Sequence, residues 1–104
     1  MNEIEQFGRQ IGEQFGAEKV ILFGSYAQGT AKQDSDIDLL VVAKTKLSPS
    51  QRYGAVRRIL GDYPAGFDIV VETPEEFNRW RTVVNHIVYF AARYGKVLYE
   101  RSGS

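Results

Sequence analysis

The chain of 104 residues contains no cysteine and only one histidine, and its charges balance. The lack of cysteine excludes disulfide bonds, thiolate catalysis and zinc sites built on sulfur. Thirteen lysine and arginine residues against thirteen aspartate and glutamate residues give a formal net charge of zero. Because sequence-independent binding to nucleic acid depends on excess positive charge, this balance argues against a general DNA- or RNA-binding protein.

Long hydrophobic segments are also missing. No apolar run approaches the roughly 20 residues that a membrane-spanning helix needs. Residues 1–15 mix polar and apolar side chains, which is not typical of a signal peptide. We therefore expect a soluble protein of the cytoplasm. Its length and its 43% content of hydrophobic residues suit one globular domain, residues 1–100, followed by a disordered tail at residues 101–104.

The spacing of hydrophobic residues predicts four helices that alternate with four strands. Apolar side chains at helical intervals indicate helices at residues 4–15, 25–29, 49–64 and 74–94. Two of these helices begin with a capping residue followed by proline, as in Ser48-Pro49 and Thr73-Pro74. Short apolar runs indicate strands at residues 19–23, 37–43, 67–71 and 97–99. This order predicts an α+β or α/β fold, in which helices pack on a small sheet.

A glycine-serine turn follows the first predicted strand, at Gly24 and Ser25. Glycine allows the strand to turn sharply into a helix and lets a ligand approach the backbone. The N–H groups at the start of such a helix suit phosphate oxygens, and the hydroxyl group of Ser25 adds a donor. The turn is therefore a candidate binding site for a triphosphate.

Three aspartates lie at the beginnings of apolar strands. Asp36 and Asp38 are two residues apart, so their side chains fall on the same face of the sheet, about 7 Å apart at the backbone. Asp68 begins another apolar strand and would reach the same place if the two strands are neighbours. Carboxylates this close repel one another unless a cation neutralises them, and magnesium favours carboxylates together with substrate phosphates. The three acids are therefore candidate metal ligands and catalytic groups.

The segment from Gly24 to Val41 resembles the signature of the polymerase-beta-like nucleotidyltransferase superfamily, in particular its minimal nucleotidyltransferases. The signature joins a Gly-Ser turn, an alanine and a glycine at fixed offsets, and Ser-Asp-x-Asp before an aliphatic strand. Asp68 corresponds to the third carboxylate of the family, and the final residues 94–100 are similar to the end of such domains. The matching positions in the signature are Gly24, Ser25, Ala27, Gly29, Ser35, Asp36, Asp38 and Leu39.

This resemblance implies a mixed sheet and an enzyme that transfers a nucleoside monophosphate. The transfer expected first is that of AMP from ATP. Gly24 and Ser25 would bind the triphosphate, and Asp36, Asp38 and Asp68 would hold two magnesium ions. Family members often carry arginines where this chain has Tyr26 and Gln28.

Lys32 is the candidate that could replace the missing positive charge. The resemblance also implies a partner: minimal members are paired with small helical toxins of the HEPN type, for which they serve as antitoxins. In some cases they adenylylate the toxin. The acceptor hydroxyl would then lie on such a protein or on a second copy of this chain.

Simpler interpretations exist for each of these residues. Taken alone, Gly24-Ser25 fits an ordinary capped turn, and Asp36 and Asp38 fit a solvated strand entrance. His86 fits a packed or capping residue better than a general base. Basic residues on the helix at residues 49–64 fit a solvated face; they are Arg52, Arg57 and Arg58.

Other functions also remain open. The chain could be a non-catalytic nucleotide-binding module that neutralises a partner by forming a complex. Transfer to a small molecule and nucleic-acid synthesis are disfavoured, because larger relatives use a second domain to hold the acceptor. The sequence leaves the acceptor, the base of the donor nucleotide and the oligomeric state undetermined.

Overall fold

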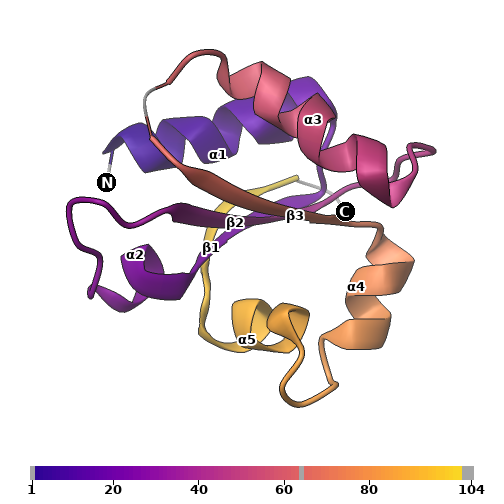
Figure 1. Cartoon of the computed structure of the whole chain (residues 1–104). Coiled ribbons are helices and arrows are strands. Elements are labelled where there is room, and N and C mark those ends of the chain that lie inside the picture. Colours follow the sequence, from indigo (N-terminus) through magenta and orange to yellow (C-terminus); the bar gives the residue numbers. More distant parts are fainter. Residues whose placement is uncertain (1, 64, 102–104) are drawn as a thin grey trace.

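The computed structural model describes residues 2–63 and 65–101, and its centre is a four-stranded sheet in the order β3-β2-β1-β4 (Figure 1). Strand β1 runs antiparallel to both of its neighbours, whereas β2 and β3 are parallel. This mixed sheet with its helices confirms the α+β prediction. The strands are β1 (Lys19–Phe23), β2 (Ile37–Val42), β3 (Phe67–Glu72) and β4 (Lys96–Glu100).

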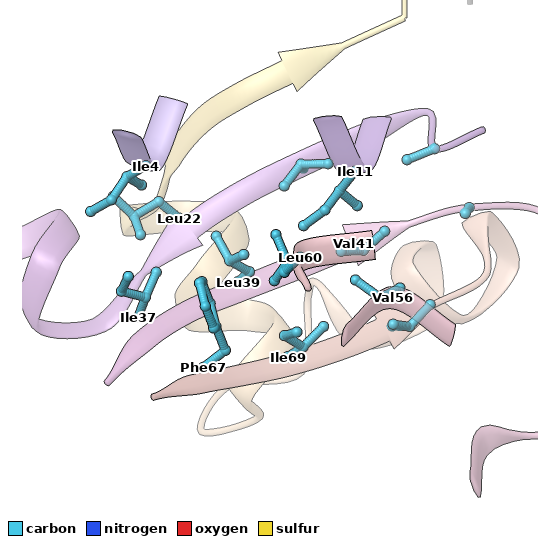
Figure 2. Packing of buried hydrophobic residues seen from close by; sticks show 14 residues of the cluster. Ile4, Ile11, Leu22, Ile37, Leu39, Val41, Val56, Leu60, Phe67 and Ile69 are labelled. Atoms are coloured by element: carbon cyan, nitrogen blue, oxygen red, sulfur yellow. The ribbon is translucent and has the colours of Figure 1, made fainter. Parts of the chain in front are cut away.

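Helices α1 (Asn2–Phe15) and α3 (Pro49–Leu60) cover one face of the sheet. Figure 2 shows Ile11 of α1 and Val56 of α3 gathered with Leu22, Leu39 and Ile69 of three strands, and all of them are buried. Burial of each such side chain contributes about 1.5–3 kcal/mol to folding. This cluster fixes the positions of the strands that carry the candidate acids.

Two glycines of α1 allow the helix to pack closely against β4. A Cβ atom on Gly8 would lie 2.5 Å from the Cβ atom of Leu98, and one on Gly12 would overlap the ring of Tyr99. Glycine in a helix costs about 1 kcal/mol relative to alanine. The close approach of α1 to the edge strand explains why this cost is accepted at both positions.

The opposite face of the sheet is covered by α4 (Pro74–Trp80) and α5 (Ile87–Tyr94). Phe77 of α4 and Val88 of α5 pack there against the strand residues Ile21, Leu40 and Val42. Successive side chains of a strand point to opposite faces. The even-numbered residues of β2, which include Asp38, therefore face the same side as α4 and α5.

The prediction of one continuous helix over residues 74–94 is wrong. The helix breaks after Trp80, Asn85 has a positive φ of 75°, and α5 begins after His86. His86 caps α5, because its Nδ1 accepts a hydrogen bond of 3.1 Å from the N–H group of Val88. This confirms a capping role for His86, whose ring also stacks on that of Trp80 with centroids 4.6 Å apart. The hydrophobic spacing continues across the break, but Val84 there is 64% exposed.

The prediction that Arg52 belongs to a solvated face is also wrong. Its side chain is buried, and its Nη1 donates to Oε1 of Glu76 at 2.8 Å and to the carbonyl oxygen of Val71 at 3.3 Å. Its Nε donates to the carbonyl oxygen of Leu47 at 3.1 Å. Helix α3 thereby binds both β3 and α4. Arg58 is exposed, as expected.

The ends of two predicted segments differ from the prediction or lie outside the described residues. Helix α3 ends at Leu60, and Pro64 lies outside the described residues. Within the tail predicted at 101–104, Arg101 donates a backbone hydrogen bond of 2.9 Å to the carbonyl oxygen of Glu18; residues 102–104 are not described. Among the residues that are described, no helix is long and apolar enough to cross a membrane.

Candidate active site

The glycine-serine turn joins the end of β1 to the short helix α2 (Gly24–Gln28). Gly24 has a φ of +73°, in the left-handed region that favours glycine. The turn of α2 closes through a hydrogen bond of 2.9 Å from the N–H group of Thr30 to the carbonyl oxygen of Ser25. The first N–H groups of a helix have no partner within the helix. The backbone at Gly24 and Ser25 is therefore arranged as a strand-to-helix turn of the kind predicted to bind a triphosphate.

Strand pairing places two of the candidate acids side by side at the same end of the sheet. In the parallel pair β2–β3, Asp38 stands directly opposite Asp68. In the antiparallel pair β1–β2, Asp38 stands opposite Phe23, the residue before Gly24. The prediction that Asp68 lies on the strand next to Asp38 is thus confirmed, and the turn and both acids form one row across three strands.

Two glycines make room for two of the carboxylates. A Cβ atom on Gly24 would lie 2.9 Å from Cγ of Asp38 and would overlap its carboxylate oxygen. A Cβ atom on Gly66 would lie 3.0 Å from Cγ of Asp36 and would likewise overlap an oxygen. Gly66 was missed by sequence reasoning, although its place just before the strand of Asp68 was a usable signal. Each of these acids therefore occupies space that only a neighbouring glycine leaves open.

The three acids interact electrostatically. Partial burial raises the pKa of Asp38 above its usual value, and the nearby charges of Asp68 and Asp36 raise it further. Asp36 and Asp68 themselves are exposed. A divalent cation at this position would relieve the repulsion between the carboxylates.

These residues fit magnesium by their chemistry. Within residues 2–63 and 65–101, no three acidic or histidine side chains are arranged so that they enclose an ion by themselves. Magnesium, however, is commonly bound by one or two carboxylates, while substrate phosphates and water fill its other positions. Asp38 with Asp36 or Asp68 supplies such a donor set beside the turn for the phosphates.

The loop before the acids is closed by Ser35. Its Oγ accepts a hydrogen bond of 2.8 Å from the N–H group of Lys32, and its own N–H group donates to the carbonyl oxygen of Lys32 at 3.1 Å. These bonds confirm that Ser35 has a structural role. The side chain of Lys32 is exposed on this loop, and no other described residue forms an ion pair with it.

The two neutral residues of α2 differ in their surroundings. Tyr26 is partly buried and packs against the main core cluster beneath α1 and α3. Gln28 is exposed. The tyrosine thus contributes to the core.

Comparison with known families identifies the class of this chain. The model of the nucleotidyltransferase domain matches residues 4–90, so the chain belongs to the nucleotidyltransferase domain family. It is 49% identical over 45 residues to a candidate protein adenylyltransferase of Methanocaldococcus jannaschii and 48% identical over 33 residues to the protein adenylyltransferase MntA of Thermococcus cleftensis. These alignments cover 41% and 32% of this chain. They span 31% and 33% of the two relatives, about a third of their length.

Solved structures show the same fold. A chain from the crystal structure of a toxin–antitoxin complex with AMP-PNP superposes with a TM-score of 0.69 at 23% identity, over 94% of this chain and 74% of that one. A nucleotidyltransferase-like protein of Sulfolobus solfataricus gives a TM-score of 0.65 at 22% identity, over 97% and 80% of the two chains. A complex of a tri-AMPylated HEPN toxin with an MNT antitoxin from Shewanella oneidensis gives 0.55 at 21% identity, over 96% and 69%. These likenesses extend over nearly the whole of this chain.

Proposed function

We propose that this chain is a magnesium-dependent nucleotidyltransferase that moves AMP from ATP to a hydroxyl group of a partner protein. The observation that carries the proposal is the contact of the turn at Gly24 with Asp38, which stands opposite Asp68 on the next strand and near the charge of Asp36. A turn for phosphates next to clustered carboxylates is the arrangement that phosphoryl chemistry requires. The partner we propose is a toxin of the HEPN type, which the chain would neutralise as an antitoxin.

The reaction can be written with the residues of this chain. Gly24 and Ser25 would hold the triphosphate, and Lys32 would add positive charge to it from the flanking loop. The acceptor oxygen would attack the α-phosphorus of ATP, forming a new P–O bond. The bond between the α- and β-phosphates would break, and pyrophosphate would leave. The proton of the acceptor hydroxyl would pass toward Asp68, the exposed carboxylate opposite Asp38.

Magnesium held by Asp36, Asp38 and Asp68 would neutralise the negative charge that develops on the phosphates. The family commonly uses two such ions. The raised pKa of Asp38 supports this assignment, since burial and the two neighbouring carboxylates disfavour its charged form in the absence of a cation.

The comparisons support the choice of donor and partner. The relative from Thermococcus cleftensis is a protein adenylyltransferase, and one structural neighbour is a toxin–antitoxin complex with AMP-PNP. Another neighbour comes from the complex of a tri-AMPylated HEPN toxin with an MNT antitoxin. An acceptor on a partner protein agrees with these likenesses.

The test is transfer of label from α-labelled ATP, with magnesium, to HEPN-type proteins of the same organism. We expect label on the acceptor protein with the wild-type chain. The double variant Asp36→Asn, Asp38→Asn should abolish it. Asp34→Asn is the matched control, because Asp34 is exposed on the same loop but lies outside the row of acids.

Two results would contradict the proposal. The first is the absence of label from every nucleoside triphosphate while the chain still neutralises the toxin. The second is full neutralisation by the double variant. Either would favour the alternative, a nucleotide-binding module that acts by forming a complex.

A further inference from the structure

Exposed apolar side chains are concentrated in one part of the chain. Seven large hydrophobic side chains are exposed among the described residues, and all but Tyr53 lie between residues 83 and 97. We call these six the α5 surface, and their exposed fractions range from 42% to 64%. Such concentrations mark interaction sites more often than isolated exposed residues do. The α5 surface consists of Val83, Val84, Ile87, Phe90, Tyr94 and Val97.

Helix α5 displays part of this surface as an ordered stripe. Ile87, Phe90 and Tyr94 follow one another at helical spacing, whereas Val88 and Ala91 are buried on the opposite side of the helix. The rings of Phe90 and Tyr94 lie nearly parallel, at 24°, with centroids 6.4 Å apart. Figure 1 shows α5 on the outside of the molecule, beyond the sheet. The stripe on α5 is therefore an apolar face that no other element covers in the described part of the chain.

The charged side chains within the segment that carries the α5 surface have one sign. Residues 77–99 contain no aspartate or glutamate, although they carry four of the thirteen basic residues of the chain, Arg79, Arg81, Arg93 and Lys96. The remaining residues carry nine basic and all thirteen acidic side chains. A chain with no net charge thus presents six of its exposed apolar residues in a segment without acids.

A hollow of about 330 Å³ lies at the side of the stripe and brings two of these cations together. Arg81 and Arg93 line it, together with Thr82, Tyr89 and Ala92. Guanidinium groups and hydroxyl donors suit a carboxylate. Among the described residues, neither arginine forms an ion pair with an acid of this chain.

The α5 surface adjoins the candidate active site. Gly95 directly follows α5, and a Cβ atom on it would lie 2.9 Å from the carbonyl oxygen of Leu22. Lys96 then pairs with Leu22, which is two residues before Gly24. A protein seated on α5 would therefore lie next to the turn for the triphosphate.

We propose that the α5 surface docks the acceptor protein, and that the docking face of that protein combines apolar side chains with carboxylates. The apolar stripe would give affinity, and the hollow between Arg81 and Arg93 would receive an acidic side chain. This inference rests on the proposed function for the identity of the partner as the acceptor. The chemistry of the surface itself is independent of catalysis.

Two other occupants fit the surface less well. A second copy that pairs through the same face would bring like charges together, because a two-fold interface sets the same patch against itself. A membrane-bound amphipathic helix has a polar face rich in lysine and arginine, whereas α5 carries one basic residue, Arg93, and buries Val88 and Ala91 in the core. An acidic protein satisfies both the apolar stripe and the arginines.

The first experiment uses defined peptides as probes. Two fluorescent helical peptides of equal length share one leucine-rich face, but one carries glutamate and the other lysine along its flanks. We expect the glutamate peptide to bind the chain, as measured by fluorescence anisotropy, and the lysine peptide to bind at least about tenfold more weakly. Equal binding of the two peptides, or no binding of either, would overturn the proposal.

Variants locate the binding to the surface. Phe90→Ser and Arg93→Glu should each lower the affinity for the glutamate peptide at least about tenfold. Arg93→Glu should also raise the affinity for the lysine peptide. Tyr53→Ser is the control for Phe90→Ser, because Tyr53 is equally exposed, at 44% against 45%, but lies on α3. Lys46→Glu is the control for Arg93→Glu at an exposed position far along the chain. Loss of binding in the controls as well would contradict the assignment.

Three further measurements separate this inference from the proposed function. If label transfer to the acceptor occurs but is unchanged in Phe90→Ser and Arg93→Glu, the proposed docking surface is wrong and the proposed enzymatic function is supported. If the glutamate peptide binds as predicted but no protein is labelled, the proposed binding surface is supported and the proposed AMP transfer is contradicted. Binding of phosphatidylglycerol vesicles in preference to the peptide, or dimerisation lost in Phe90→Ser, would assign the surface to a membrane or to a second copy.

Discussion

The carboxylate of Asp38 lies directly against the backbone of Gly24, so that a methyl group at position 24 would come within 2.9 Å of Cγ of Asp38. The turn for the phosphates and the central acid are thus in contact. Neither can be altered without affecting the other.

Gly24→Ala should abolish transfer while leaving a folded protein. The substitution displaces the Asp38 carboxylate, and a misplacement of about 1 Å can cost roughly 100-fold in rate. Gly29→Ala is the matched control: Gly29 also has a positive φ, of 76°, but no atom lies within 4 Å of its added Cβ. Both variants should lose about 1–2 kcal/mol from left-handed backbone strain. Equal transfer rates in the two variants would refute the contact with Asp38.

Gly66→Ala should weaken the binding of magnesium through Asp36. The added methyl group forces the Asp36 carboxylate to rotate away, and isothermal titration with magnesium and a non-hydrolysable ATP analogue would measure the loss. We expect the affinity to fall about tenfold or more, as when a supporting partner of a metal ligand is removed. Gly54→Ala, inside α3 with its nearest neighbour 3.9 Å away, should leave the affinity unchanged.

Arg52→Met should lower the free energy of unfolding by about 3 kcal/mol, because it leaves the partly buried Glu76 carboxylate and two carbonyl groups without the donor that the buried arginine supplies. Three hydrogen bonds from the guanidinium group are lost, to Glu76, Val71 and Leu47. Urea denaturation would measure the difference. Arg58→Met on the same helix should stay within about 0.5 kcal/mol of the wild type. If Arg52→Met also changes the free energy of unfolding by less than about 0.5 kcal/mol, the pair of Arg52 and Glu76 does not stabilise the fold.

Glu72 and Glu76 should give the protein a stability that depends on pH in two opposite directions. Burial, and then a hydrogen bond with Glu76, raises the pKa of Glu72 to about 7. The hydrogen bond from the backbone of Thr73 is the main cause that lowers the pKa of Glu76 to about 2. Between pH 2 and 4.5 the unfolded chain binds more protons at Glu76, so stability rises with pH. Between pH 4.5 and 7 the folded chain binds more protons at Glu72, so stability falls.

Thermal melting of Glu72→Gln tests this directly. Glutamine imitates the protonated acid and does not titrate, so the variant should lose the decline between pH 4.5 and 7 and keep the rise below pH 4.5. Glu75→Gln, at an exposed neighbouring position, should behave like the wild type. If the melting temperatures of the wild type and of Glu72→Gln change in parallel with pH above pH 4.5, a raised pKa at Glu72 is excluded.

His86→Ala should destabilise the start of α5 by about 1 kcal/mol, the usual cost of losing a helix cap. His86→Asn should restore most of this, because asparagine is a favourable capping residue. Trp80 is the only tryptophan of the chain, so its fluorescence reports on the stack with His86. We expect that emission to change in both variants. An unchanged spectrum would mean that the rings do not stack in solution.

The sequence was informative wherever local chemistry determines local structure. The four strands, the turn at Gly24 and the cap at Thr73 follow from short patterns, and the parallel pairing of Asp38 with Asp68 agrees with a rule that acids in apolar strands need partners. The break at residues 81–86 escaped prediction because the apolar spacing is continuous through it. Only the cap by His86 and the positive φ of Asn85 end the helical path.

Features that depend on contacts between distant segments could not be predicted. Nothing near Arg52 in the sequence identifies Glu76 as its partner, 24 residues away, or indicates that the arginine would be buried. The role of Gly66 in making room for Asp36 depends on two loops meeting in space. The spacing of hydrophobic residues shows which face of a helix or strand is apolar, but it does not show which other element covers that face.

Strand β3 stands at the edge of the sheet, and two of its carbonyl groups accept hydrogen bonds from side chains of α3. The hydroxyl group of Tyr53 donates to the carbonyl oxygen of Phe67, and Arg52 donates to that of Val71. An exposed apolar edge strand is a template onto which another chain can add a strand and begin to aggregate. Helix α3 thus makes β3 a poorer template for an added strand: two of its side chains occupy carbonyl acceptors of this edge strand, and Arg52→Met would free one of them.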